Sequence, residues 1–197
     1  MRTLLRNIAI VVAALILFGA SFALNATANK NMQEDHLELL QTLLPSEETF
    51  VVVPYDGEDA NIRSVHKSEK GFIVECVTYG YAGEIRMFVA VNNDGKVQGL
   101  VVREAHETYG LGSRILTDHV FLSQFLNSGG TFEVATHGAD AFSSATGTAD
   151  AGTGETVEVD GITGATVTSK AVARCVTSAV AYVTGADVGS AATSWGG

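Results

Sequence analysis

The residues best suited to binding chemistry lie between Asp160 and Lys170, which read Asp-Gly-Ile-Thr-Gly-Ala-Thr-Val-Thr-Ser-Lys. Gly164 carries no side chain where a ligand would pass, and Ala165 beside it is small. Three nearby threonines, Thr163, Thr166 and Thr168, bring hydroxyl groups to the same corner. The stretch joins a Gly/Ser/Thr-rich region to a segment with helical periodicity, so the corner is a predicted helix start.

That helix is predicted from about Thr168 to Val183, with Thr168 or Ser169 as its N-cap. Its apolar face consists of Val172, Val176, Ala179, Val180 and Val183. The free N–H groups and partial positive charge of a helix start hold phosphate without help from lysine or arginine. These residues alone therefore fit two interpretations. One is a binding site for phosphate or another anion, and the other is an ordinary capped helix start.

A second glycine-containing loop lies upstream, at Glu107-Thr108-Tyr109-Gly110-Leu111-Gly112. Two glycines one residue apart let backbone N–H groups approach a ligand closely. The alternative is a plain strand-to-helix connection in which Ser113 caps a helix of about residues 113–127.

The remaining pattern predicts an α+β fold with an antiparallel sheet and packed helices. Strands are expected at 50–53, 71–79, 85–92, 96–104, 131–135 and 157–159. Asp94-Gly95 is a strong hairpin signal. Tyr79-Gly80-Tyr81-Ala82-Gly83 predicts a bend whose aromatic rings pack in the core or turn, and residues 138–156 predict a surface loop.

The N-terminus predicts a membrane anchor. Residues 7–24 are apolar, and Arg2 and Arg6 precede them, which predicts a cytoplasmic N-terminus and an extracytoplasmic remainder. A signal peptide cleaved near Ala26-Thr27-Ala28 is the alternative. The expected division is 1–28 for the cytoplasmic end and single transmembrane helix, 29–49 for a juxtamembrane helix (33–44) and linker, 50–186 for the extracytoplasmic domain, and 187–197 for a flexible tail.

Composition excludes several classes of site. The formal net charge is −10, with 22 acidic and 12 basic residues and no basic stripe, so nucleic acid is not an expected partner. Cys76 and Cys175 form no CxxC pair, and the five histidines show no metal-ligand spacing. Buried thiols and a single disulfide both remain open.

The segment Asp160–Thr166 resembles the flavinylation motif Asp-x-x-Ser/Thr-Gly-Ala-Thr of the covalent FMN-binding domain family, which includes the G subunits of Rnf-type ion-translocating oxidoreductases. The order of anchor, Asp94-Gly95 hairpin, Glu107–Gly112 loop and motif is similar too, and the C subunits of sodium-pumping quinone reductases are more distant relatives. The family commonly has proline where this chain has Tyr109. The resemblance implies FMN joined by phosphoester to Thr166, with Thr163, Gly164, Ala165 and Thr168 around the phosphate.

The same resemblance implies that Glu107, Thr108, Gly110, Leu111 and Gly112 pack against the isoalloxazine ring. It also implies a flavin transferase during maturation, and membrane and iron–sulfur subunits as partners. An electron carrier of this kind needs no catalytic acid, base or nucleophile and no metal. The acidic surroundings should disfavour anionic reduced flavin.

Three functions are therefore weighed. The first is an electron-transfer subunit of an Rnf-type ferredoxin:NAD⁺ oxidoreductase. The second is a stand-alone membrane-anchored flavinylated protein in extracellular electron transfer, which co-purification with an Rnf complex would distinguish from the first. The third is a non-redox surface binding module whose Thr163–Thr166 segment only begins a helix.

Overall fold

A five-stranded antiparallel sheet with strand order β1-β2-β3-β4-β5 forms one layer of the domain. The structure is a computed structural model that describes residues 35–46, 49–107, 110, 112–113, 116–135 and 156–186. The strands are β1 Val51–Val53, β2 Ile62–Ser68, β3 Gly71–Tyr79, β4 Glu84–Asn92 and β5 Val97–Ala105. The α+β class and the antiparallel sheet are confirmed.

The β4–β5 hairpin forms where Asp94-Gly95 predicts it. Gly95 has φ of 77°, a conformation that glycine adopts without strain, and its N–H donates to Asn92 O at 3.0 Å. The Asn92 side-chain oxygen also accepts from the backbone N–H groups of Asp94 and Lys96. These bonds set the register of β4 against β5.

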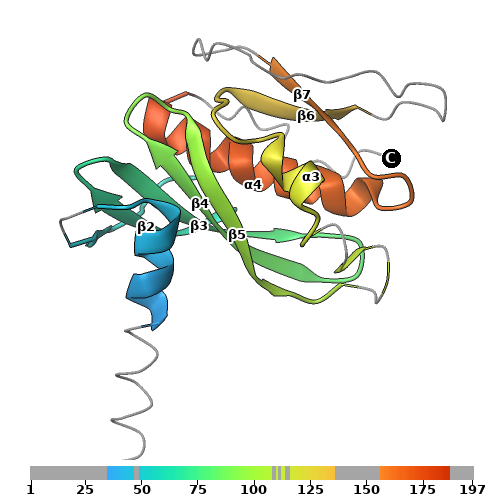
Figure 1. The fold of residues 1–197 in the computed structure, drawn as a ribbon, viewed down its shortest axis with the longest axis horizontal. Coiled ribbons are helices and arrows are strands. Elements are labelled where there is room, and N and C mark those ends of the chain that lie inside the picture. The colour runs from blue at the N-terminus through green and yellow to red at the C-terminus, as the bar shows by residue number, and fades with distance from the viewer. Residues whose placement is uncertain are drawn as a thin grey trace, which may run out of the picture. The chain divides into compact units, whose positions relative to one another are not determined.

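Helix α4, Thr166–Thr184, lies between the sheet and a second, two-stranded layer (Figure 1). That layer pairs β6, Thr131–Ala135, with β7, Thr156–Asp160, in parallel. One face of α4 supplies Val172, Cys175, Val176 and Ala179 to a core shared with the inward side chains of β3 and β4. The helix carries alanine, valine, serine and threonine because a layer on each side leaves room only for small side chains.

Two sequence expectations need correction. No continuous helix runs from 113 to 127: residues 116–117 form a turn, and α3 covers only His119–Ser123. Asp118, not Ser113, is its N-cap, because the carboxylate accepts from Val120 N and Phe121 N. Strand β2 was not singled out, since the polar residues between Arg63 and Lys67 obscure its alternation.

Residues 35–43 are helical and end before Pro45, as the periodicity of 33–44 predicts. No helix among the described residues is long and apolar enough to cross a bilayer. The predicted anchor at 7–24, most of the loop at 138–156 and the tail at 187–197 lie outside the described residues.

Cys76 in β3 and Cys175 in α4 are buried free thiols. The Cys76 thiol lies 3.4 Å from the Cys175 carbonyl oxygen. Its contact with the Cys175 thiol and its burial raise the pKa of Cys76 well above the ordinary value, so this thiol stays protonated at neutral pH.

One buried hydrogen bond ties α4 to the second layer and gives a stability prediction. The Thr177 hydroxyl accepts from Phe132 N at 2.9 Å. Thr177→Val leaves that buried N–H without a partner, so we expect the free energy of unfolding to fall by about 1–3 kcal/mol. Chemical denaturation measures it. Thr184→Val is the control: its hydroxyl bonds only to Val180 O in its own helix, and its effect should stay within about 0.5 kcal/mol. Equal effects would contradict the prediction.

Candidate functional site

Helix α4 begins without a side-chain cap. Its N-cap residue is Ala165, with φ of −132° and ψ of 30°, and within the described part of the chain no side-chain cap bonds to this end of the helix. The expectation that Thr168 or Ser169 caps the helix is wrong. The Ser169 hydroxyl instead donates to Ala165 O at 3.0 Å and accepts from Ile162 N at 3.4 Å, so it closes the preceding turn. The helix start therefore keeps its free donors and its partial positive charge.

The turn before the helix requires Gly164. Ala165 N donates to Ile162 O at 2.9 Å, and Gly164, at the third position of this turn, has φ of 84°. This is the type II geometry, which favours glycine at that position. Thr163 and Gly164 are exposed, Thr166 is half-buried, and Ala165 is buried. Thr166, as the first helical residue, thus stands at the open end of α4.

Thr168 is fully buried, yet its hydroxyl has no hydrogen-bond partner among the residues that the structure describes. An unpaired buried hydroxyl costs free energy, and most buried polar groups are paired. Here the unpaired group lies in the first turn of α4, two residues after Thr166. The open backbone donors of α4 and the glycine turn before it form a corner that can accept a phosphate group.

Side chains from other elements hold this corner in place. Gln124, just after α3, donates through its amide to Asp160 O at 3.3 Å and accepts from Asp160 N at 2.8 Å. Gly161 N donates to Ala135 O at 3.3 Å, and a Cβ on Gly161 would collide with the Val134 side chain. The chain leaving β7 is therefore fixed before it enters α4.

The second predicted loop is tied to the bend between β3 and β4. The Glu107 carboxylate accepts from Tyr81 N at 2.8 Å and from Ala82 N at 3.3 Å. Gly80 makes this possible, because a Cβ there would overlap with Glu107 Oε1. Glu107 thus has a structural role in the domain, which its position in a glycine-rich motif did not predict.

The rest of that loop is described in part. Gly110 is exposed, has φ of 113° and donates from its N–H to the Ser113 hydroxyl at 3.3 Å. Gly112 is buried. Thr108 and Leu111 lie outside the described residues.

The bend at 79–83 exposes its two tyrosine rings, although the sequence predicts that they pack in the core or in the turn. Tyr79 is 62% and Tyr81 73% exposed. Arg174 of α4 donates through Nη2 to Tyr79 O at 3.4 Å, which brings α4 next to this bend. In Figure 1 the β3–β4 bend and the start of α4 lie toward the same side of the domain. Arg174 was missed because it lies in the middle of a helix, outside both motifs.

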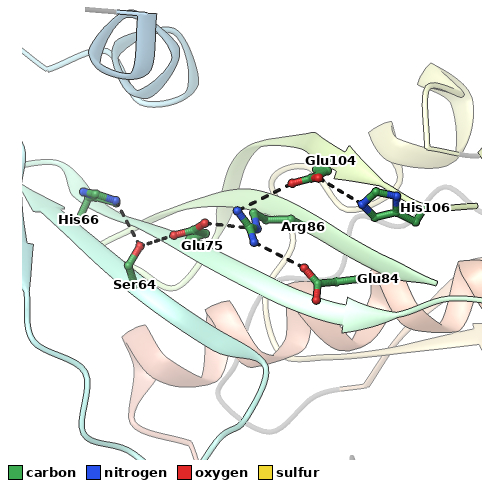
Figure 2. A network of polar contacts seen from close by, with 7 residues as sticks. All are labelled: Ser64, His66, Glu75, Glu84, Arg86, Glu104 and His106. Atoms are coloured by element: carbon green, nitrogen blue, oxygen red, sulfur yellow. Dashed lines mark hydrogen bonds and ion pairs between the residues drawn. The ribbon is translucent and has the colours of Figure 1, made fainter. Parts of the chain in front are cut away.

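A separate polar network lies on the opposite face of the sheet (Figure 2). The Arg86 guanidinium is within 3.5–3.8 Å of the carboxylates of Glu75, Glu84 and Glu104. His106, which is exposed, is 3.2 Å from Glu104. Partly exposed pairs of this kind contribute little to stability each, and the arginine charge is already matched. Among the residues that the structure describes, no group of three or more His, Cys, Asp or Glu is placed to hold a metal.

The unpaired hydroxyl of Thr168 gives a prediction opposite in sign to that for Thr177. Thr168→Val removes a buried polar group that has no partner, so the free energy of unfolding should rise by about 1 kcal/mol. The measurement is chemical denaturation of the purified protein. A loss of about 1 kcal/mol or more would mean that the hydroxyl has a partner in the folded protein.

The contact between Gly80 and Glu107 can be tested by a double-mutant cycle. Gly80→Ala should cost about 1–3 kcal/mol of unfolding free energy, because the new methyl group displaces the carboxylate. In a Glu107→Ala background the same change should cost less than half as much, with the Ile85 side chain the remaining obstacle. The four free energies come from denaturant titrations. Additive costs would show that Glu107 does not occupy the space beside Gly80.

Comparison with known proteins identifies the domain. The FMN-binding domain family matches residues 80–181. A Haemophilus influenzae protein, named as the G subunit of an ion-translocating oxidoreductase complex, is 36% identical over 70 residues, which cover 32% of this chain and 34% of that protein. Its namesake in Cereibacter sphaeroides is 33% identical over 115 residues, covering 53% of this chain and 52% of the relative. The matched regions thus span about a third to a half of the relatives.

Among solved structures, the crystal structure of Shewanella oneidensis NqrC is similar, with a TM-score of 0.42 and 22% identity over 70% of this chain and 65% of that one. The family match carries the assignment, since it runs from the bend after β3, through the Glu107 loop and the open start of α4, to the last turns of that helix. Because this match covers just over half of the sequence, the chain belongs to the FMN-binding domain family.

Proposed function

We propose that the chain is an electron carrier that holds FMN in phosphoester linkage to Thr166. The observation that carries the proposal is the open start of α4, where Thr166 is half-buried beside N–H groups that have no side-chain cap. Bound FMN would supply the redox chemistry, and the protein would supply position and surroundings.

The corner can bind a phosphate in a defined orientation. The first-turn N–H groups of α4 donate to phosphate oxygens, and the bare backbone at Gly164 allows close approach. The exposed Thr163 adds a hydroxyl donor near Thr166. Thr168 is buried on another side of the helix, so its hydroxyl is the less accessible of the two. Because Gln124 and Ser169 fix the incoming chain, little conformational entropy remains to be lost on loading.

The loop at Glu107–Gly112 is the proposed contact for the flavin ring. Its support is its position: Glu107 is bound to the 79–83 bend, and Arg174 joins that bend to α4. Gly110 leaves exposed backbone there, and a Cβ built on it meets nothing within 4 Å. No acid, base or nucleophile is needed for electron transfer, so these residues bind and shield.

We further propose that the chain serves in an Rnf-type complex as its extracytoplasmic flavin subunit. The support is twofold: the relatives are named as G subunits of ion-translocating oxidoreductase complexes, and Arg2 and Arg6 precede the apolar segment at 7–24. In this arrangement the domain lies outside the cytoplasm, and membrane and iron–sulfur subunits exchange electrons with it. A flavin transferase would attach the FMN.

Intact-mass spectrometry tests the central claim. Protein from cells that contain the flavin transferase should carry added mass equal to FMN less one water, on the peptide with Thr166. Thr166→Val keeps the shape of the side chain but removes its oxygen, so the covalent yellow chromophore should be lost while the fold is retained. Thr184→Val removes a hydroxyl at the far end of the same helix and should keep the added mass. Acid-stable flavin on Thr166→Val would exclude Thr166 as the attachment residue.

A further inference from the structure

Arg174 has unused hydrogen-bonding capacity. A guanidinium carries five N–H donors, yet the one bond of Arg174 is the long contact of Nη2 with Tyr79 O at 3.4 Å. Its Nε is shielded from solvent and has no acceptor. Among the described residues four buried side-chain atoms lack a partner, and two of these, Thr168 Oγ1 and Arg174 Nε, belong to α4. The other two are Asp59 Oδ2 and Arg86 Nε. Unpaired buried donors are rare, so Arg174 Nε is a candidate contact for a ligand.

Arg174 also lacks a counter-ion in the described part of the chain. Arg86, the contrasting case, has three carboxylates within 3.5–3.8 Å on the far face of the sheet (Figure 2). The sequence holds 22 acidic and 12 basic residues, so an unmatched arginine is not explained by a shortage of carboxylates. Arg174 is half-buried, so its guanidinium has lost part of its hydration without gaining an ion pair. A bound anion would offset this loss of hydration energy.

The position of Arg174 relates it to the corner at Thr166. Thr166, Lys170 and Arg174 are spaced i, i+4 and i+8, so they follow one stripe of α4. Eight residues of helix measure about 12 Å, which places Arg174 well beyond a phosphate at Thr166. The five-carbon ribityl chain of FMN likewise separates the ring from the phosphate. Arg174 also contacts the bend to which Glu107 is bound.

We propose that Arg174 binds the electron-rich pyrimidine edge of the flavin ring and stabilises its negatively charged reduced form. This inference rests on the proposed function. Two-electron reduction balances as FMN + 2 e⁻ + H⁺ → FMNH⁻, with the added negative charge spread over N1 and the C2 carbonyl. The oxidised ring is neutral, so a fixed guanidinium interacts more strongly with the product than with the reactant. Arg174 therefore raises the midpoint potential of the flavin, against the trend set by the acidic composition.

The test is a spectroelectrochemical titration of the flavin in purified full-length protein, after mass spectrometry has confirmed loading. Arg174→Gln should weaken the binding of reduced relative to oxidised flavin about tenfold, which for a two-electron couple lowers the midpoint potential by about 30 mV. Lys170→Gln removes an equal charge from the same stripe, but its exposed ammonium is screened, so the change should stay below about twofold.

Arg174→Lys separates charge from structure. It keeps the positive charge but lacks the planar fork, so the relative affinity should fall only about threefold. If Arg174→Gln does not fold or load, this variant carries the test, and an unchanged potential would overturn the inference. An equal fall for Gln and Lys would show that the Tyr79 contact, not charge, matters, and would overturn it as well. Wild-type protein without FMN would refute the proposed function itself, whereas loaded variants with the wild-type potential would refute only the role of Arg174.

Discussion

The placement of α4 between two sheets is the constraint on which the rest of the domain depends. One face of the helix supplies the core against β3 and β4, while Thr177 accepts a hydrogen bond from β6. A helix held on both sides has no freedom to slide or rotate, because its small side chains are closely packed. Every group at its start and along its exposed stripe is thereby held in a fixed position relative to the β3–β4 bend.

That rigidity explains how the domain tolerates an uncapped helix start. A Ser, Thr, Asp or Asn at the N-cap contributes about 1 kcal/mol in many proteins, but this chain has Ala165 there and buries the Thr168 hydroxyl without a partner. Tertiary packing along the nineteen residues of α4 compensates for the stabilisation that an N-cap hydrogen bond would otherwise contribute. Local rules are broken where a site needs free donors, as is expected of functional positions.

The sequence predicted those elements whose signals are local. The Asp94-Gly95 hairpin and the apolar stripe of α4 were correct, because turn geometry and helical period are decided by near neighbours. The helix start was placed two residues late, since Thr168 looks like a cap when its burial is unknown. Strand β2 escaped because polar residues obscure its alternation. The parallel pairing of β6 with β7 and the role of Glu107 depend on contacts between distant segments, which periodicity does not contain.

The same reasoning explains why Arg174 escaped the sequence motifs. A lone arginine in a helical sequence is most simply interpreted as a solvated charge. The structure adds that no carboxylate of the described residues pairs with Arg174, whereas Arg86 has three. Functional groups are positioned most accurately on rigid elements. The closely packed helix α4 therefore holds an unpaired donor in a fixed geometry, and its packing offsets the free-energy cost of that donor. The unpaired Nε of Arg174 therefore places a candidate ligand contact in the middle of α4, between the regions of the two glycine motifs.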